Sequence, residues 1–183
     1  MVIETTPLAG LLVLRPKVFG DERGFFMETY SRKVFHAAGI TEEFMQDNHS
    51  RSVRGTLRGL HFQSHPGQAK LVRAARGRVW DVAVDIRPAS ATFGKWHAVE
   101  LSDEEKNMLF IPVGFAHGFC VLSDEADFIY KVSSLYDPAT ECGIAWDDPD
   151  LAVAWPVPDP LLSARDLKNQ SFRQWAAAQG GKS

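Results

Sequence analysis

The sequence predicts an all-β fold, a sandwich or barrel, built as one domain. Many short apolar segments are separated by regular polar turns, and almost no segment in the middle of the chain has helical periodicity. The chain has 183 residues, of which 45% are hydrophobic and 23% charged, so it is long enough to bury a core. No internal repeat, low-complexity tract or linker divides it, and we expect a single domain over residues 1–183.

The strands are predicted where apolar residues alternate or run together between turn signals. In chain order they lie at residues 11–14, 25–30, 79–86, 93–101, 120–122 and 126–133, with a further apolar segment at 108–111. Polar, Gly-rich or Pro-containing turns and loops are predicted at residues 7–10, 20–24, 87–90, 102–107, 137–138, 148–149 and 156–160. The polar run at residues 44–52 has too little apolar content to be core.

Two segments are predicted to be helical. Ser31 is an N-cap residue type for a helix over residues 32–38, and Gly39 ends that helix. The end of the chain, residues 163–179, again has a helical pattern. The fold is therefore expected to be strands with a few short peripheral helices.

Composition excludes several function classes. A net charge of −3 argues against non-specific nucleic-acid binding, which requires a basic face. No apolar run approaches the length of a membrane span and the N-terminus lacks a charged leader, so we expect a cytoplasmic protein without a membrane partner. Cys120 and Cys142 lie in apolar surroundings without C-x-x-C spacing, which favours buried thiols, with a disulfide as the alternative.

Residues 54–78 concentrate the chemistry of the chain. Arg58, His61 and Lys70 are interleaved with apolar residues at a period near two, which predicts strands that carry cations on an inner wall and a site for an anionic ligand. Arg58 and His61 are three residues apart and would face opposite ways on a regular strand. Gly59 is a candidate for a bulge that turns one of them.

Two segments resemble the paired motifs of the cupin superfamily, which folds as a jelly-roll β-barrel. The first motif is represented by Gly55, His61, Gln63, Gln68 and Gly77, and the second by residues 112–117, PVGFAH. A metal-binding cupin would need imidazole and carboxylate where this chain has the two glutamines, and neutral amides are poor replacements. We therefore expect no metal and no other cofactor.

His61 has two interpretations. It is either a core histidine satisfied by hydrogen bonds or a general base, which a paired carboxylate would orient and stabilise when charged. Candidate partners are Asp81 and Asp85, which share one face of the strand at residues 79–86, and Asp166. Asp166 fits a helix capping box beginning at Ser163 equally well.

The other polar candidates also have a structural alternative. Tyr130 is either a packed strand residue or a phenol that returns a proton from the far side of the barrel. Arg23, Arg58 and Lys70 are either a solvated surface set or a site for a diphosphate, which the glycines beside the two arginines favour.

The chain resembles one cupin branch, the dTDP-4-dehydrorhamnose 3,5-epimerases, from about residue 20 to residue 166. The resemblance rests on the segments DERGFFME (21–28), QDN (46–48), LRGLH (57–61), QAKLVR (68–73), DVAVD (81–85), 111–119, YK (130–131), YDP (136–138) and GIAW (143–146). Such enzymes invert C3 and C5 of a 4-keto-6-deoxy sugar nucleotide without a metal or redox cofactor. The resemblance implies His61 as the base, Asp166 as its partner with Asp81 supporting, Tyr130 as the acid and Lys70 as the cation for the enolate.

The resemblance also implies which residues bind the nucleotide sugar. They are Arg23, Phe25, Glu28, Gln46, Asn48, Arg58, Lys70, His117, Tyr136, Glu141 and Arg165. Arg165 departs from the lysine common in the family, which changes the hydrogen-bonding geometry there. Family members pair as dimers with crossing N-terminal strands, so a homodimer is expected in which Arg23 and Glu28 reach the partner's site.

Three other functions remain open from the sequence. An epimerase acting at C3 or C5 alone would keep the same residues. A non-catalytic nucleotide-sugar binding module would be expected to lose the base or the acid, and neither is lost. A metal-dependent cupin oxygenase is disfavoured by Gln63 and Gln68.

Overall fold

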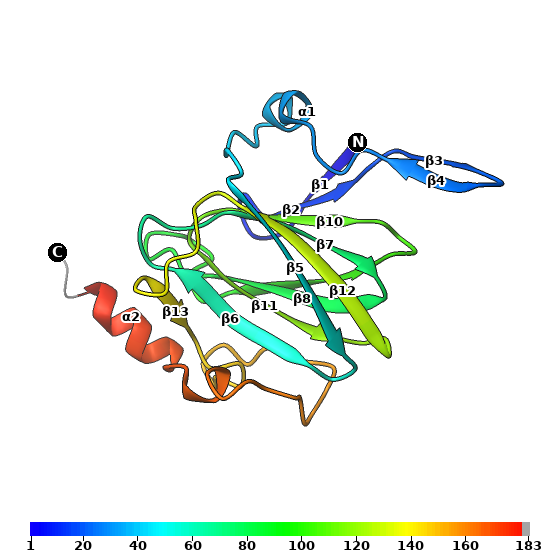
Figure 1. The fold of residues 1–183 in the computed structure, drawn as a ribbon. Coiled ribbons are helices and arrows are strands. Elements are labelled where there is room, and N and C mark those ends of the chain that lie inside the picture. The colour runs from blue at the N-terminus through cyan, green and yellow to red at the C-terminus, as the bar shows by residue number, and fades with distance from the viewer. Residues whose placement is uncertain (181–183) are drawn as a thin grey trace.

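The computed structural model of the protein describes residues 1–180, and two antiparallel sheets lie face to face around its core (Figure 1). The larger sheet has the order β1-β2-β10-β7-β12-β5 and the smaller one β13-β6-β11-β8-β9. The larger sheet comprises β1 (Val2–Thr5), β2 (Leu12–Arg15), β10 (Met108–Ile111), β7 (Lys70–Arg76), β12 (Glu125–Val132) and β5 (Gln46–Val53). The smaller one comprises β13 (Glu141–Gly143), β6 (Leu57–Gln63), β11 (Phe115–Val121), β8 (Arg78–Asp85) and β9 (Trp96–Ser102). The predicted all-β fold is confirmed.

The main core lies between the two sheets. Val72 and Phe128 from the larger sheet pack with Val79, Ala83 and Phe119 from the smaller one, and each is at most 4% exposed. The Phe119 and Phe128 rings stack with centroids 4.0 Å apart. This contact joins β11 of the smaller sheet to β12 of the larger sheet through the core.

Two helices and one 3₁₀ turn decorate the barrel. They are α1 (Arg32–Ala37), η1 (Asp166–Lys168) and α2 (Phe172–Gly180). The helical segment predicted over residues 163–179 is divided into η1 and α2, because Gln170 between them pairs with Ile144. Ser31 precedes α1 as predicted, but its side chain makes no capping hydrogen bond. No helix within residues 1–180 is long and apolar enough to cross a membrane.

Two other segments differ from the prediction. Residues 20–24 are not simply a turn, because β3 (Val18–Asp21) extends into this segment and pairs with β4 (Gly24–Met27). The polar run at residues 44–52 contains the edge strand β5, which pairs with β12 alone and alternates exposed and half-buried residues. An edge strand needs few apolar residues, since one side of it faces solvent.

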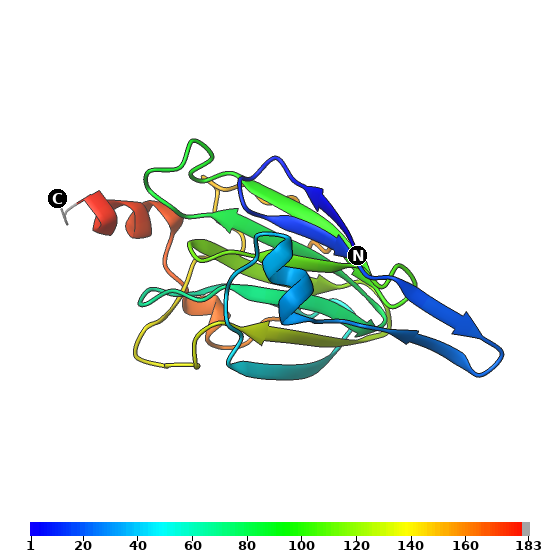
Figure 2. The same cartoon turned by 90° about the horizontal axis from the view of Figure 1, so that it is seen from above.

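The β3–β4 hairpin projects from the body of the molecule, away from α2 (Figure 2). Phe19, Phe25 and Phe26 on this hairpin are 53%, 60% and 69% exposed. Three exposed aromatic rings on one arm form an apolar surface of the kind that usually contacts another protein.

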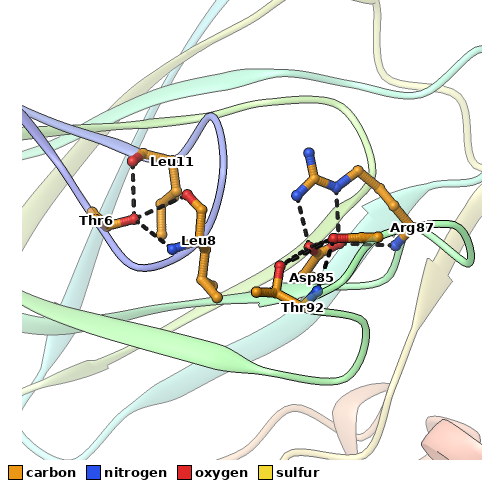
Figure 3. Close-up of polar contacts among 7 residues, drawn as sticks. Thr6, Leu8, Leu11, Asp85, Arg87 and Thr92 are labelled. Atoms are coloured by element: carbon orange, nitrogen blue, oxygen red, sulfur yellow. Dashed lines mark hydrogen bonds and ion pairs between the residues drawn. The ribbon is translucent and has the colours of Figure 1, made fainter.

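The two carboxylates of β8 have different surroundings. Asp85 is fully buried and accepts hydrogen bonds from the Arg87 guanidinium and the Ser90 and Thr92 hydroxyls, so it fixes the turn after β8 (Figure 3). Asp81 pairs instead with His117 on the neighbouring strand β11.

The cysteines are free thiols. Cys120 is buried in β11, as predicted, whereas Cys142 on the short strand β13 is partly exposed.

Candidate active site

A cavity of about 440 Å³ opens between the sheets, and most of the predicted site residues line it. Those on its wall are His61, Tyr130, Asp166, Lys70, Gln46, Asn48, Arg58, His117, Tyr136, Glu141 and Arg165. They come from both sheets and from the segment after residue 160. The barrel therefore brings together residues that lie up to 120 positions apart in the chain.

A bulge in β6 places Arg58 and His61 on the same wall. His61 is opposite His117 on β11, but Arg58 is opposite Phe119, so three steps along β6 face two along β11. Gly59 has φ +137, and a Cβ at this position would lie 2.5 Å from the Gly118 Cα. Glycine is required here by both the backbone conformation and the close approach of β11. The predicted bulge is confirmed.

Asp166 is the carboxylate that pairs with His61. Its Oδ1 lies 2.5 Å from His61 Nε2, and Ser163 Oγ donates to its Oδ2 at 2.8 Å. The Asp166 backbone N–H donates back to Ser163 Oγ at 3.0 Å, so the capping interaction is also present. Asp166 therefore meets both predictions, since its carboxylate pairs with His61 and its backbone N–H makes the capping hydrogen bond to Ser163.

The environment of Asp166 keeps it ionised. It is 4% exposed, and burial alone would raise its pKa. The hydrogen bond and charge of His61, the Ser163 hydroxyl and the Arg165 charge outweigh burial, and the pKa of Asp166 lies below its ordinary value. Because His61 uses Nε2 for this pair, Nδ1 is the nitrogen left to accept a proton.

Asp81 belongs to a second pair. His117 Nε2 lies 3.0 Å from both Asp81 carboxylate oxygens, and both residues are buried. Burial lowers the pKa of His117 below its ordinary value, although the Asp81 charge opposes that effect. Asp81 thus supports His117 behind the wall, and neither Asp81 nor Asp85 is the partner of His61.

Lys70 is a buried cation beside the His61 backbone. It is 7% exposed, and its Nζ donates to the His61 carbonyl oxygen at 3.3 Å. Burial lowers the pKa of Lys70 to about 8, against the opposing charges of Asp81 and Glu141. An ammonium in this position is poorly hydrated and so interacts strongly with any negative charge that develops in the cavity.

Tyr130 lies on the opposite wall from His61. It belongs to β12 of the larger sheet, whereas His61 belongs to β6 of the smaller one, and both line the cavity. Burial raises the pKa of Tyr130 above its ordinary value, so the phenol keeps its proton near neutral pH. The cavity therefore has a proton acceptor on one wall and a proton donor on the other.

Polar residues ring the outer part of the cavity. Arg165 forms an ion pair of 2.5 Å with Glu141, and Gln46 accepts the Tyr136 backbone N–H at 3.1 Å. Gln46 also donates to Asn48 at 2.8 Å. The Tyr136 residue is 53% exposed, so its ring is free to stack on a planar group. Arg165, which stands where the family commonly has lysine, therefore lines the cavity and pairs with Glu141 there.

Arg23, Phe25 and Glu28 do not reach this cavity. They lie on or just after the β3–β4 hairpin, which projects from the barrel (Figure 1). Arg23 pairs there with Asp21 at 2.5 Å. The cavity of one chain is therefore built without three residues that the resemblance assigns to the site.

The sequence interpretation missed the role of the two glutamines. The sequence pattern places Gln63 and Gln68 only at the positions of metal ligands, whereas in the structure both line the cavity. Ser50 and Ser163 line it as well. Gln63 lies two residues after His61, and this period-two spacing is the signal that could have placed it on the same wall. Within residues 1–180, no three His, Cys, Asp or Glu residues are grouped to hold a metal ion.

The chain is similar to known sugar-nucleotide epimerases. The family model described as dTDP-4-dehydrorhamnose 3,5-epimerase matches residues 5–174. An enzyme of that name from Shigella flexneri is 56% identical over 174 residues, which are 94% of this chain and 96% of the relative.

The chain is also similar to solved structures of sugar-nucleotide epimerases. The crystal structure of dTDP-6-deoxy-D-glucose-3,5-epimerase from Legionella pneumophila Philadelphia 1, in complex with dTDP-4-keto-L-rhamnose, has a TM-score of 0.94 at 47% identity, covering 97% of this chain and 95% of that one. A 3'-monoepimerase from Streptomyces bikiniensis, in complex with dTDP-quinovose, has a TM-score of 0.88 at 35% identity, covering 96% of this chain and 89% of that one. These matches span both sheets and all the strands that line the cavity.

Proposed function

This chain belongs to the dTDP-4-dehydrorhamnose 3,5-epimerase family, and we propose how its cavity carries out the reaction. The protein is an isomerase that inverts C3 and C5 of dTDP-4-dehydro-6-deoxyglucose, a step in dTDP-L-rhamnose biosynthesis. The observation that carries the proposed roles is the position of the His61–Asp166 pair opposite Tyr130 in one cavity.

His61 removes the proton in this proposal. C3 and C5 both adjoin the C4 ketone, so each C–H becomes acidic once the enolate oxygen is stabilised. Nδ1 of His61 takes the proton, and the electron pair of the broken C–H bond is delocalised onto the ketone oxygen, which gives the enolate. Asp166 stabilises the imidazolium that forms. The Lys70 ammonium lies beside the His61 backbone and holds the negative charge on the oxygen.

Tyr130 completes the inversion. Its phenol donates a proton to the same carbon from the opposite face, and the enolate returns to the ketone. His61 then loses its proton to solvent and Tyr130 regains one, so the net change at each carbon is inversion with proton exchange. Support for this role comes from the place of Tyr130 on the larger sheet, facing the wall that carries His61.

The remaining residues bind the substrate in this proposal. Arg58 pairs with the diphosphate, and Tyr136 stacks near the sugar. The polar ring around the outer cavity, Gln46, Asn48, Glu141 and Arg165, completes the contacts together with His117, which lies deeper in the wall.

The protein acts as a homodimer in this proposal. The β3–β4 hairpin of one protomer delivers Arg23, Phe25 and Glu28 to the cavity of its partner. The exposed aromatic rings of the hairpin support this, because an arm that projects from its own chain has surface to bury elsewhere. We expect the dimer to act in the cytoplasm on the free nucleotide sugar.

Incubation with dTDP-4-dehydro-6-deoxyglucose in heavy water tests the function. Deuterium at both C3 and C5, measured by mass spectrometry and proton NMR, is the expected result. Deuterium at one carbon alone would make the enzyme a single-site epimerase, which the similarity to a 3'-monoepimerase makes a relevant alternative. Absence of deuterium at both carbons would contradict the proposed roles.

A further inference from the structure

We infer that Gln63 is a further substrate-binding residue, which donates a hydrogen bond to an oxygen of the sugar ring or its substituents. The inference rests on the proposed function and adds a specificity contact to it.

Gln63 is oriented by the same strand that orients His61. The two residues are two positions apart at the end of β6, beyond the bulge, so their side chains leave the same face of the strand. Gln63 is opposite Glu141 in the register with β13, and both line the cavity. The Gln63 side chain is thus part of the wall that carries the base.

One end of the Gln63 amide is held and the other is not. Thr140 Oγ1 donates to Gln63 Oε1 at 2.9 Å. Gln63 Nε2 is buried and has no hydrogen-bond partner among residues 1–180, although the residue as a whole is 7% exposed. A buried N–H without an acceptor costs roughly 1–3 kcal/mol, so an oxygen of a bound ligand that accepted from it would stabilise the complex.

Gln68 shows what a purely structural glutamine looks like in the same cavity. Its Nε2 donates to the Ser134 carbonyl oxygen at 2.9 Å and thereby ties down the loop after β12. Gln63 also touches that loop, through Thr140, but only by its oxygen. The free amide nitrogen of Gln63 is not needed for the loop, since the Ser64 backbone N–H already holds the Thr140 carbonyl at 2.9 Å.

The depth of Gln63 indicates which part of the substrate it meets. Gln63, Lys70 and His117 are each at most 7% exposed, whereas Tyr136 is 53% exposed. The reacting sugar must lie deep, next to His61 and Lys70, and the nucleotide lies toward the open rim. The Gln63 N–H therefore donates to an oxygen of the sugar, either the ketone or a hydroxyl. A buried donor discriminates strongly against a ligand that lacks the matching oxygen.

Two variants separate substrate binding from support of the loop. Gln63→Met keeps the length of the side chain but removes the N–H donor and the acceptor for Thr140. Thr140→Val removes the loop hydroxyl that contacts Gln63 Oε1 and Asp137, but it keeps the Gln63 N–H donor. For both variants, kcat/KM for dTDP-4-dehydro-6-deoxyglucose and the dissociation constant of dTDP, which lacks the sugar, are measured with the wild type as reference.

We expect Gln63→Met to lower kcat/KM for the nucleotide sugar about three- to tenfold, the effect of one neutral hydrogen bond. The dissociation constant of dTDP should change less than twofold, and Thr140→Val should change neither value more than twofold. The inference would be overturned if Gln63→Met weakened dTDP binding as much as it lowered kcat/KM. It would also be overturned if Thr140→Val lowered kcat/KM as much as Gln63→Met, or if Gln63→Met did not lower kcat/KM. If the wild type shows no deuterium exchange at C3 or C5, the proposed function fails instead of the inference about Gln63. Binding of dTDP is measured separately and does not depend on that exchange.

Discussion

Asp166→Asn is the substitution that most directly tests the base assignment. Asparagine fits the same space and leaves the backbone contact to Ser163, but it removes the charge that faces His61 Nε2 at 2.5 Å. The His61 imidazolium that forms during proton abstraction then loses its counter-charge in a site where Asp166 is 4% exposed. A hydrogen bond to a charged group contributes about 1.5–3 kcal/mol.

That range converts to a loss of about 10- to 150-fold in kcat/KM, at about 1.4 kcal/mol for each factor of ten. The assay is deuterium incorporation at C3 and C5 in heavy water, together with dTDP titration and thermal unfolding. We expect dTDP affinity to stay within threefold of wild type, because Asp166 serves the sugar end of the cavity.

Ser163→Ala is the matched control for this experiment. It removes the Ser163 hydroxyl, which donates to Asp166 Oδ2 and accepts the Asp166 backbone N–H, and it leaves the Asp166 charge in place. A neutral hydrogen bond contributes about 0.5–1.5 kcal/mol, so we expect kcat/KM to fall about two- to tenfold. An Asp166→Asn enzyme that exchanges both carbons within threefold of the wild-type rate would refute the assignment of the pair. A similar loss in both variants would show that the Asp166 side chain acts through its contact with Ser163 and not through its charge on His61.

Three further predictions follow from the same geometry. Tyr130→Phe should retain deuterium exchange from the His61 side while product formation falls at least tenfold, and unchanged product formation measured by NMR would remove Tyr130 from the role of acid. Because burial lowers the pKa of Lys70 to about 8, its ammonium is lost as pH rises through that value, so kcat/KM should fall above about pH 8. Lys70→Met should be slow at every pH and lack this decline; a persistent decline would point to another group. Gly59→Ala should lower the free energy of unfolding by about 2–4 kcal/mol in urea titration, because its Cβ would meet the Gly118 Cα, and a change below 1 kcal/mol would contradict the required bulge.

The sequence alone determined the features that depend on neighbours in the chain. Alternating apolar residues predicted the strands, and Gly59 between Arg58 and His61 predicted the bulge, because a backbone at positive φ excludes other residue types. The motifs around His61 and His117 also predicted the cavity wall, since period-two spacing fixes which side chains share a face. The polar run that became β5 was not identified as a strand, because an edge strand lacks the apolar pattern on which such predictions depend.

The tertiary structure brings the His61 imidazole and its carboxylate into contact. The residue pattern left Asp81, Asp85 and Asp166 equally available, whereas the family resemblance named Asp166, which is 105 residues away in the chain. Its position depends on the segment after residue 160 crossing the barrel and pairing with Thr56 and Ile144, which are contacts that no local pattern encodes. The unpartnered amide of Gln63 likewise became visible only in three dimensions, because the absence of an acceptor is a property of the whole packed neighbourhood.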